Sequence, residues 1–492
     1  MTGITRDPQG IAHYDGLAPS VVEMLRRTVE RLPDKEAIVE MDGPRVTYRE
    51  LWDRSARVAG GLRGGGVRRG DRVAIRYGNS LNWVFGFFGT LLAGAVAVPV
   101  NTRFTEPEAD YVIKDSGARV VLQPGMRPPE GQPYAVEDLK LIDLAAIFYT
   151  SGTTGFPKGA MTTNENFLSN VETAQRVKQM AFNGTQRNLI SVPLFHVTGC
   201  NSQLLPTCYD GGTTVIMPVF EVQAFLRVIR EERIDVMASV PAIYWLAMNQ
   251  PNFKDVDTSA IRWLSYGGAP IAPDLVARIL NAFPNARVGN GFGLTETSSI
   301  ATLLPHDYAA TRPESVGFAA PVVDLDLFEP DPASGAGELL IRGPNVVPGY
   351  WNKPDATKAT FVNGWLHTGD MALIDADGFV QIVDRKKDMI NRGGENVYCV
   401  EVENALCAHP DVFEVAVMGV RDEVMGEKVG AVIVPMPGRH PDSQQIAAFA
   451  RERIADFKVP QYLAIRNTPL PRNPSGKILK PALRKETRWE KL

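Results

Sequence analysis

Apolar residues recur with two different periods along the first half of the chain. In segments such as 21–33 they return every three or four residues, which predicts amphipathic helices. Short apolar runs such as 36–40, 71–77 and 95–101 predict buried strands. A further helix should begin near Thr47, since a threonine at this position caps a helix well. Helices and strands alternate at short spacing, which predicts a parallel sheet covered by helices on both faces.

The pattern changes from about Gly337 onward. Short β segments separated by Gly, Asn and Asp turns predict an antiparallel subdomain. Beyond Lys387, a helix at 400–409, strands at 412–420 and 428–436 and a second helix at 443–457 predict a compact α+β unit of roughly 100 residues, which is large enough to fold separately. We therefore expect an α/β protein. A large N-terminal domain (1–386) holds parallel-rich sheets flanked by helices and a small β subdomain, and a small α+β C-terminal domain (387–492) follows.

The composition is that of an ordinary globular protein. The chain has 492 residues, of which 44% are hydrophobic and 22% charged, and this argues against disorder, collagen-like repeats and coiled coil. The net charge of −4 gives no basic excess, so nucleic acid is not an expected partner. Any phosphate-bearing ligand must then be held by local geometry.

Cysteine usage and the first ten residues predict a cytoplasmic protein. The chain has four cysteines, too few for a disulfide framework, and we expect buried free thiols in a reducing compartment. Residues 1–10 show neither the basic nor the apolar region of a targeting signal. Residues 78–102 lack charge, but Asn82, several glycines and Pro99 interrupt them, which favours a buried helix running into a strand over a transmembrane segment.

A hydroxyl- and glycine-rich loop at 149–159, YTSGTTGFPKG, directly follows an apolar strand. Glycines let backbone N–H groups approach a phosphate, hydroxyls add donors, and Lys158 supplies a point charge. The loop is not a Walker A motif, because Pro157 precedes the lysine and Gly159 follows it. The loop therefore predicts a polyphosphate site outside the P-loop fold, with a flexible surface loop as the alternative.

With this loop and further motifs in the same order, the chain resembles the adenylate-forming superfamily. This superfamily comprises acyl-CoA synthetases, peptide-synthetase adenylation domains and firefly-type luciferases, and the chain is most similar to an acyl-CoA synthetase of the fatty-acid–CoA ligase type. The further motifs are VTYREL at 46–51, LLAGAVAVPVN at 91–101, GGAP at 267–270, GFGLTE at 291–296, WLHTGD at 365–370, DRKKD at 384–388, RGGENVY at 392–398 and NPSGK at 473–477.

The resemblance implies an ATP site built from these motifs. Phe292 matches the ring that stacks on adenine, and Asn290 matches the amide at the adenine amino edge. Asp370 and Arg385 match the ribose contacts, although DRKKD alone reads as a charged linker. The residues so implied for ATP or AMP binding are Thr150, Ser151, Gly152, Thr153, Thr154, Gly155, Lys158, Gly267, Gly268, Ala269, Pro270, Asn290, Gly291, Phe292, Gly293, Asp370 and Arg385.

The resemblance also assigns catalytic residues. Thr295 matches the α-phosphate hydroxyl, and Glu296 matches the carboxylate that holds Mg²⁺, although alone it could be a helix-capping acid. Lys477 matches the lysine that reaches from the small domain to the carboxylate and α-phosphate, and Lys387 matches the hinge about which a mobile small domain rotates. A lone histidine in an apolar setting is more often a core residue, but the resemblance places His196 beside the acyl pocket as a lining and gating group.

The remaining residues implied by the resemblance concern the acid and coenzyme A. The acyl pocket is expected at His196, Val197, Thr198, Gly199, Gln203, Val240, Tyr244 and Gly267. The pantetheine tunnel is expected at Arg392, Gly393 and Gly394. Arg392 stands where a small residue is usual, and Cys399 stands where the family's NVYP has proline.

We therefore expect a ligase that converts a carboxylic acid and ATP into acyl-adenylate and pyrophosphate, and then uses coenzyme A to form acyl-CoA and AMP. The mostly apolar pocket set favours a fatty or cyclic acid. Mg²⁺ is the expected cofactor, ATP and CoA are co-substrates, and a homodimer is left open. Two alternatives remain: an adenylating enzyme that loads a carrier protein, and a non-catalytic scaffold relative.

Overall fold

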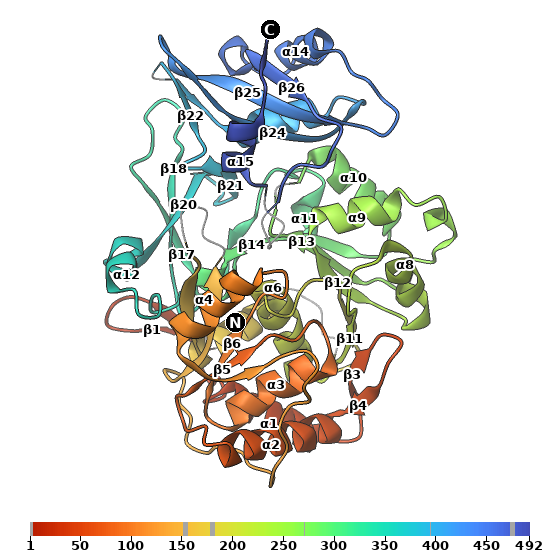
Figure 1. Cartoon of the computed structure of the whole chain (residues 1–492), viewed down its shortest axis with the longest axis vertical. Coiled ribbons are helices and arrows are strands. Elements are labelled where there is room, and N and C mark those ends of the chain that lie inside the picture. The colour runs from red at the N-terminus through yellow and green to blue at the C-terminus, as the bar shows by residue number, and fades with distance from the viewer. Residues whose placement is uncertain (1–2, 151–155, 178–182, 270, 394, 473–477) are drawn as a thin grey trace.

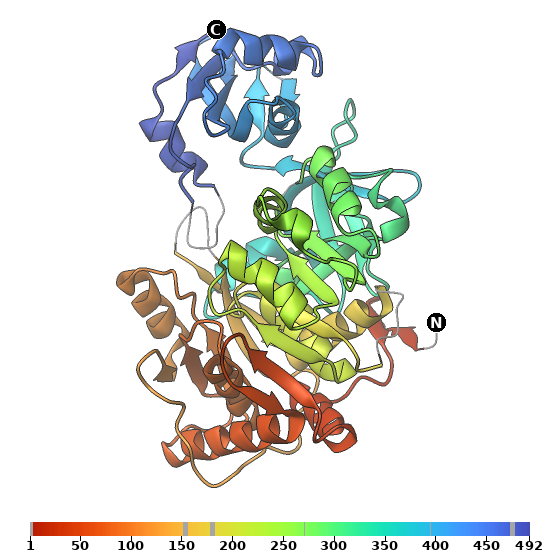
Figure 2. The same cartoon turned by 90° about the vertical axis from the view of Figure 1, so that its right-hand side faces the viewer.

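The structure is a computed structural model, and it describes residues 3–150, 156–177, 183–269, 271–393, 395–472 and 478–492. The chain forms a large, sheet-rich N-terminal domain and a smaller C-terminal domain (Figure 1). The C-terminal domain lies at one end of the longest axis, apart from the N-terminal sheets (Figure 2). The mixed α/β class predicted from the sequence is confirmed, whereas the boundary at 386/387 stays a prediction.

One N-terminal sheet has the strand order β7-β5-β6-β8-β9, parallel except for the β8–β9 pair. Helices α2 and α3 pack side by side along it, and α2 begins with a capping box between Thr47 and Glu50. The elements are α2 (Tyr48–Gly64), β5 (Arg72–Ile75), α3 (Leu81–Leu92), β6 (Val96–Pro99), α4 (Glu106–Ser116), β7 (Ala118–Leu122), β8 (Leu144–Thr150) and β9 (Lys158–Thr163).

The largest sheet has the order β16-β15-β14-β13-β12-β10-β11-β3-β4, parallel from β14 to β3 and antiparallel at both edges. Its members are β3 (Glu36–Glu40), β4 (Arg45–Thr47), β10 (Arg187–Ile190), β11 (Thr213–Ile216), β12 (Val236–Ser239), β13 (Trp263–Gly267), β14 (Arg287–Leu294), β15 (Ser299–Leu304) and β16 (Phe318–Ala319).

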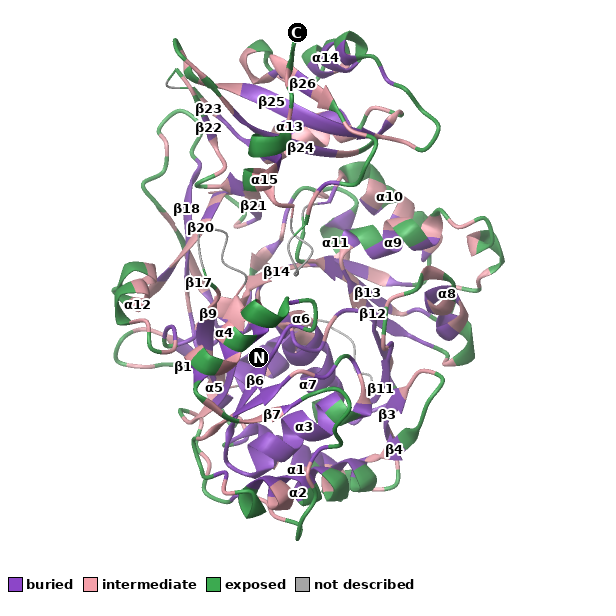
Figure 3. Cartoon of the chain, viewed as in Figure 1, coloured by how far each residue is buried: buried purple, intermediate pink, exposed green. Residues whose placement is uncertain are grey.

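Helices cover both faces of this sheet, as the alternating pattern predicted. On one face, side chains of α8 (Val222–Glu231), α9 (Pro241–Met248) and α10 (Pro273–Ala282) pack against Met237, Leu264 and Val288 of the strands. The other face meets a core cluster shared with the first sheet, which Figure 3 shows as buried ribbon. The helices of that cluster include α1 (Val21–Arg31), α2, α3, α5 (Asn164–Val177), the π-helical turn η1 (Cys200–Leu204) and α7 (Leu205–Asp210).

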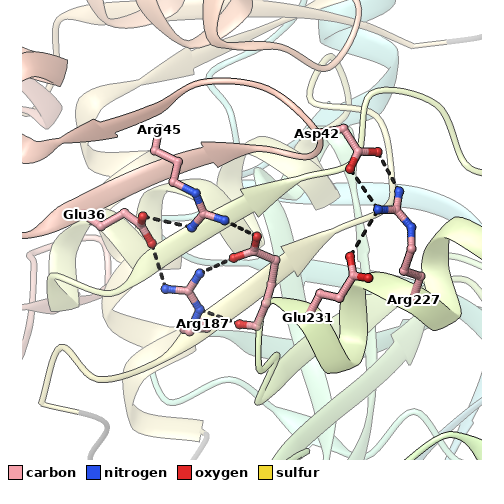
Figure 4. A network of polar contacts seen from close by, with 7 residues as sticks. Glu36, Asp42, Arg45, Arg187, Arg227 and Glu231 are labelled. Carbon is pink, nitrogen blue, oxygen red and sulfur yellow. Dashed lines mark hydrogen bonds and ion pairs between the residues drawn. The ribbon is translucent and has the colours of Figure 1, made fainter.

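An ion-pair network ties the edge of the largest sheet together (Figure 4). Arg187 of β10 contacts Glu36 of β3 at 2.8 Å and Glu232 at 2.5 Å. Arg45 of β4 contacts the same two carboxylates, with 3.0 Å to Glu36. Because these charges are half-buried and shared, they resist screening better than an isolated surface pair would.

The antiparallel subdomain predicted from about Gly337 onward is present, but it begins earlier than predicted, with strand β17. Its strand order is β17-β18-β20-β19, with β21 paired to β20. The elements are β17 (Asp324–Phe328), β18 (Gly337–Arg342), α12 (Pro354–Thr360), β19 (Phe361–Val362), β20 (Trp365–Ile374) and β21 (Val380–Arg385). Shorter elements elsewhere are β1 (Ile4–Arg6), β2 (Ala12–Tyr14), α6 (Val197–Gly199), η2 (Phe253–Asp255), η3 (Thr295–Thr297) and α11 (His306–Ala309).

The C-terminal domain has its own sheet, β23-β22-β25-β26-β27 with β24 on β25, and its own core cluster. The predicted helix at 443–457 is wrong in its length, because α14 ends at Arg451 and the chain then turns so that Ile454 and Phe457 pack on that cluster. The elements are β22 (Ile390–Arg392), β23 (Glu395–Val397), α13 (Cys399–Cys407), β24 (Val412–Asp422), β25 (Gly426–Pro435), α14 (Ser443–Arg451), η4 (Asp456–Lys458), β26 (Tyr462–Ile465), α15 (Lys480–Glu486) and β27 (Glu490–Lys491).

The uncharged segment 78–102 forms a short helix and a strand. Helix α3 has 12 residues, or about 18 Å at the usual rise, against roughly 30 Å of bilayer hydrocarbon. Across the described residues, no helix has both the length and the apolar character needed to cross a membrane.

Candidate functional site

A cavity of about 110 Å³ opens on the face of the largest sheet that carries α5 and η1. Asn188, Val236 and Trp263 are register partners on adjacent strands and belong to this face. The lining residues are Ala174, Val177, Asn188, Val197, Thr198, Ser202, Gln203, Val236, Ala238, Ser239, Trp263, Ser265, Tyr266, Gly267, Gly268, Gly291, Phe292, Gly293, Ser299, Ile300 and Leu303. The cavity thus joins predicted acyl residues to predicted nucleotide residues.

Glycines line the end of the cavity where parallel strands β13 and β14 finish. A Cβ on Gly267 would stand 2.1 Å from the Gly291 carbonyl oxygen, and one on Gly293 would stand 1.4 Å from the Ser299 carbonyl oxygen. Gly268 has a φ of +73°, which a side chain rarely adopts. Gly267, Gly268, Gly291 and Gly293 therefore form a glycine strip, in which the cavity wall is backbone alone. The strip lies at the edge of the sheet where α/β proteins bind their ligands.

The predicted adenine contacts lie beside this strip. Phe292 lines the cavity, and Asn290 is buried two residues before it. The Asn290 amide nitrogen donates to the Ser315 carbonyl oxygen at 3.0 Å. This contact leaves the amide oxygen as the atom that can accept from an exocyclic amino group.

Glu296 is held by a residue that the sequence analysis missed. The Tyr350 hydroxyl donates to Glu296 Oε1 at 2.7 Å, and Lys158 Nζ lies 4.9 Å from the centre of the Tyr350 ring. Burial raises the pKa of Tyr350, and the Glu296 carboxylate adds to this shift. Tyr350 forms an isolated bridge with Ala160 of β9, which brings the segment beside the phosphate-type loop. The only sequence signal was an aromatic pair after a Pro-Gly turn, 348–351.

The two predicted ribose residues are neighbours. Asp370 of β20 and Arg385 of β21 are register partners, and Arg385 Nε lies 2.7 Å from Asp370 Oδ1. Asp370 is buried, whereas the arginine side chain is partly exposed. A buried carboxylate beside a guanidinium is suited to accept hydrogen bonds from a diol.

Part of the predicted acyl set lies outside the cavity lining. Val197, Thr198, Gln203 and Gly267 line it, whereas His196, Gly199, Val240 and Tyr244 do not. Tyr244 is fully buried in the core on the opposite face of the sheet, and its hydroxyl donates to the Ser265 carbonyl oxygen at 2.8 Å. A Cβ on Gly199 would stand 2.4 Å from the Pro193 carbonyl oxygen, so this glycine allows two backbone segments to meet.

The residues of the predicted hinge and tunnel adjoin one another along the chain. Burial lowers the pKa of Lys387, which follows β21. Gly393, with a φ of +62°, donates its N–H to the Met425 carbonyl oxygen at 2.8 Å, and a Cβ there would stand 2.6 Å from Met425 Cε. Arg392 Nη1 lies 3.5 Å from Glu395. The tunnel role of these residues stays a prediction.

Cys399 makes a contact that proline at its position could not make. Its backbone N–H donates to the carboxylate of Asp384, and its Sγ lies 3.0 Å from the Asp388 carbonyl oxygen. Both partners belong to the DRKKD segment. The departure from the NVYP pattern therefore adds a hydrogen bond between β21 and the first residue of α13.

Some predicted site residues lie outside the described residues. These are Ser151, Gly152, Thr153, Thr154, Gly155, Pro270, Gly394 and Lys477.

The described part of the chain holds no cluster of three or more His, Cys, Asp or Glu side chains that could bind a metal ion. Glu296 therefore offers a single carboxylate. Mg²⁺ commonly takes one or two protein carboxylates and completes its shell with water and substrate phosphates. The donor set at Glu296 thus fits a Mg²⁺ ion that arrives with a nucleotide rather than a closed protein site.

Comparison with known families assigns most of the chain to two family models. The AMP-binding enzyme model matches residues 25–138 and 123–351, and the AMP-binding enzyme C-terminal domain model matches residues 401–477. A feruloyl-CoA synthase of an Amycolatopsis species is 37% identical over 479 residues, which cover 92% of this chain and 96% of the relative. A long-chain-fatty-acid–CoA ligase of Mycobacterium tuberculosis is 35% identical over 497 residues, which cover 94% and 97%.

A solved structure of a CoA synthetase is similar to this chain over nearly its whole length. The o-succinylbenzoate CoA synthetase of Bacillus subtilis, in complex with its acyl-adenylate intermediate, superimposes with a TM-score of 0.85 at 28% identity. The match covers 96% of this chain and 99% of that one.

Proposed function

This chain belongs to the AMP-binding enzyme family, and two relatives that match more than nine-tenths of it are a feruloyl-CoA synthase and a long-chain-fatty-acid–CoA ligase. On this basis we infer that it is an ATP-dependent, AMP-forming acid–CoA ligase. The observation that supports this most directly is the shared cavity. Val197, Thr198 and Gln203 line one cavity together with the glycine strip and Phe292. An acid in the apolar part would thus present its carboxylate to a nucleotide bound along the strip.

In the first half-reaction, the acid carboxylate attacks the α-phosphorus of ATP and pyrophosphate leaves. No general base is needed, because a carboxylate is already ionised at neutral pH. The protein must instead bring two anions together and offset their repulsion. We assign Lys158 to the phosphates, Thr295 to the α-phosphate, and Asp370 with Arg385 to the ribose.

Mg²⁺, when bound with ATP, neutralises phosphate charge, and Glu296 is the residue that would hold it. Tyr350 orients that carboxylate through its hydroxyl. Lys477, by its match to the family motif, would contact the carboxylate and the α-phosphate from the small domain. The coenzyme A thiol then attacks the acyl carbonyl and AMP leaves. If Lys477 must clear the site for this step, the small domain rotates about Lys387 between the half-reactions.

The test is a panel of carboxylic acids with ATP, Mg²⁺ and CoA, in which AMP release is followed. We expect continuous AMP formation that depends on the acid and on CoA. ATP cleavage to ADP, or AMP formation independent of any acid in a broad panel, would contradict the ligase assignment. The panel should be broad, because the acids in the relatives' names run from feruloyl to long-chain fatty acyl.

The same assay can test whether coenzyme A or a carrier protein accepts the acyl group. A ligase that uses CoA turns over repeatedly when CoA is added, whereas an enzyme that loads a carrier protein releases no AMP beyond the first bound adenylate. A non-catalytic scaffold would form no adenylate at all. Lys158, Glu296 and Lys477 are all retained in the sequence, which favours the catalytic alternatives.

A further inference from the structure

Two buried amide side chains on the cavity wall each carry an oxygen without a partner among the described residues. Asn188 and Gln203 are each only 2% exposed, and Asn188 Oδ1 and Gln203 Oε1 accept no hydrogen bond from that part of the protein. Both residues line the cavity. Buried polar atoms in native proteins nearly always have a partner, and an unpaired one costs free energy. Such atoms on a cavity wall therefore point to a bound group that donates to them.

Asn188 is hydrogen-bonded to the helical segment that also carries Gln203. Asn188 Nδ2 donates to the hydroxyl of Thr207 at 3.0 Å, and Thr207 follows Gln203 by four residues. Residues at this spacing lie on the same side of a helix, one turn apart. The π-helical turn Cys200–Leu204 places Gln203 on the cavity wall, and π-helical turns in helices are frequent at functional sites.

The orientation of the Gln203 amide is determined by its neighbour. Its Nε2 lies 3.4 Å from the carbonyl oxygen of Thr198, and a carbonyl can only accept. The nitrogen must therefore face Thr198, which leaves Oε1 as an acceptor for something else. The group that completes this site must be a hydrogen-bond donor, such as a hydroxyl.

The site lies at the far end of the cavity from the nucleotide. Asn188 is paired with Val236, and Val236 with Trp263, at the start of strands β12 and β13. Gly267, on the nucleotide side, is four residues further along β13. At the usual rise of about 3.3 Å per residue, these ends are roughly 13 Å apart. A donor that reaches Asn188 and Gln203 is therefore remote from the reacting carboxylate.

The side chains at this far end favour a planar molecule. Trp263, the register partner of Val236, packs in one apolar cluster with Val236, Leu303 and Val177, and all four line the cavity. An aromatic ring on the wall packs well against a second aromatic ring. An unbranched alkyl chain would fill the apolar part but leave the buried amide oxygens unpaired.

We propose that the acid substrate is a hydroxyaryl acid, and that Gln203, assisted by Asn188, determines specificity by accepting a hydrogen bond from the ring hydroxyl. The proposal rests on the proposed function and narrows its acid from apolar acids in general to planar acids with a distal donor. It also adds a polar contact to the mostly apolar pocket expected from the sequence. A site built to bind a hydroxyl rejects the analogue that lacks it, because its own polar groups are then left unpaired.

The experiment compares 4-hydroxycinnamate with cinnamate, which differ only in the hydroxyl, and with decanoate as an aliphatic acid. We expect wild-type kcat/KM to favour the hydroxylated acid by at least about tenfold. In Gln203→Met, which keeps the length of the side chain but removes the amide, that ratio should fall to within about threefold. Asn188→Leu is a second variant and should lower the ratio in the same direction.

Gln186→Met is the matched control. Gln186 is fully buried, both of its amide atoms lack a partner among the described residues, and it is not part of the cavity lining. Its replacement should leave the ratio of the two acids at the wild-type value. Thermal unfolding is a second readout. Gln203→Met removes one unpaired buried oxygen together with one long hydrogen bond to Thr198, so its Tm should stay close to the wild-type value, whereas a purely structural role predicts a clearly lower Tm.

The outcomes separate the two proposals. If no acid supports AMP formation, the proposed function fails. If acids are activated but the hydroxyl gives no advantage, if decanoate is preferred over both aromatic acids, or if Gln203→Met keeps the wild-type ratio, the specificity proposal is overturned and the ligase assignment stands. A ratio that falls equally in Gln186→Met would also overturn it, since the effect would not belong to the cavity.

Discussion

The Tyr350 hydroxyl donates to Glu296 Oε1 over 2.7 Å. The two residues lie 54 positions apart, and the same tyrosine ring lies 4.9 Å from Lys158 Nζ. One aromatic side chain therefore contacts both the carboxylate assigned to Mg²⁺ and the cation assigned to the phosphates. A hydrogen bond that fixes the carboxylate rotamer should pre-organise the site before ATP and its ion arrive.

Tyr350→Phe should weaken adenylation by removing that orientation while keeping the ring under Lys158. We expect kcat/KM for ATP to fall about tenfold, the scale of one hydrogen bond to a charged group, with a higher Mg²⁺ concentration needed for half-maximal rate. Glu296→Gln should cost more, because it removes the ligand itself. Acid-dependent pyrophosphate exchange across a Mg²⁺ series measures both, and Tyr308→Phe is a control at an exposed tyrosine. If the rate of Tyr350→Phe depended on Mg²⁺ concentration as the wild-type rate does, Tyr350 would not orient Glu296.

The stability of the folded protein should depend on pH through Asp384, in a direction that its shifted pKa determines. Burial raises its pKa from 3.8 to about 6, even though Lys480 and the Cys399 N–H act in the opposite direction. The folded protein thus binds this proton more tightly than the unfolded chain does. The associated stability is complete below pH 3.8 and is lost as the pH rises through about 6, a difference of up to about 3 kcal/mol.

The asparagine in Asp384→Asn carries no charge, so the variant should not lose stability as the pH rises through about 6. The Tm of the variant minus that of the wild type should become more positive between pH 5 and pH 7.5. Thermal scans at both values provide the measurement, and Asp257→Asn, at an exposed aspartate, is the control. A difference in Tm that is flat over this range, or that moves in the negative direction, would show that Asp384 does not titrate near pH 6 in the folded protein.

Cys399 allows the hydrogen bond to Asp384 to be tested by a matched pair of variants. Cys399→Ala removes the thiol but keeps the backbone N–H, whereas Cys399→Pro also removes the N–H that Asp384 accepts. Proline is tolerated at the first position of a helix, so the backbone itself should not be strained. We expect the proline variant to be less stable than the alanine variant by about 1–3 kcal/mol at pH 7.5. Equal Tm values for the two variants would mean that the bond contributes nothing.

Lys477 is expected to separate the two half-reactions. If its ammonium contacts the carboxylate and α-phosphate only during adenylation, Lys477→Ala should slow pyrophosphate exchange about a hundredfold. The same variant, supplied with synthetic acyl-adenylate and CoA, should form thioester at close to the normal rate. Equal loss in both steps in a folded variant would contradict domain alternation.

The order of elements could be predicted well from the sequence, because it depends on local signals. Thr47 and Glu50 form the capping box that starts α2, and the glycines at 64–66 end it. The Tyr350–Glu296 contact could not be predicted, since it joins segments that meet only through the pairing of Ala160 with Tyr350. Only part of the cavity lining could be predicted, because the lining also depends on contacts between distant segments. The position of Tyr244 along the chain, for example, does not determine which face of the sheet it occupies.

Gly199 and Gly267 show how the structure changes the choice of variants. From the sequence alone, replacing either glycine with a larger residue is the obvious way to narrow the acyl pocket. In the structure a Cβ at these positions would overlap backbone carbonyl oxygens at 2.1 and 2.4 Å. Such variants should therefore disturb the strand pairing and the turn rather than select smaller acids, and loss of Tm together with loss of all activity is the expected result.

Ala238 is the better position for narrowing the cavity. It lies on β12 two residues after Val236, on the face that lines the cavity, and its side chain is small and not fully buried. Ala238→Leu adds three carbons to the wall, so kcat/KM should fall at least about tenfold for a bulky acid such as 4-hydroxycinnamate and much less for acetate or propionate. Because the nucleotide strip is built by β13 and β14, KM for ATP should change less than about threefold, and this serves as the internal control. If the profile of acids stays the same while KM for ATP rises, the cavity holds part of the nucleotide rather than the acid, and the assignment of its two ends must be reversed.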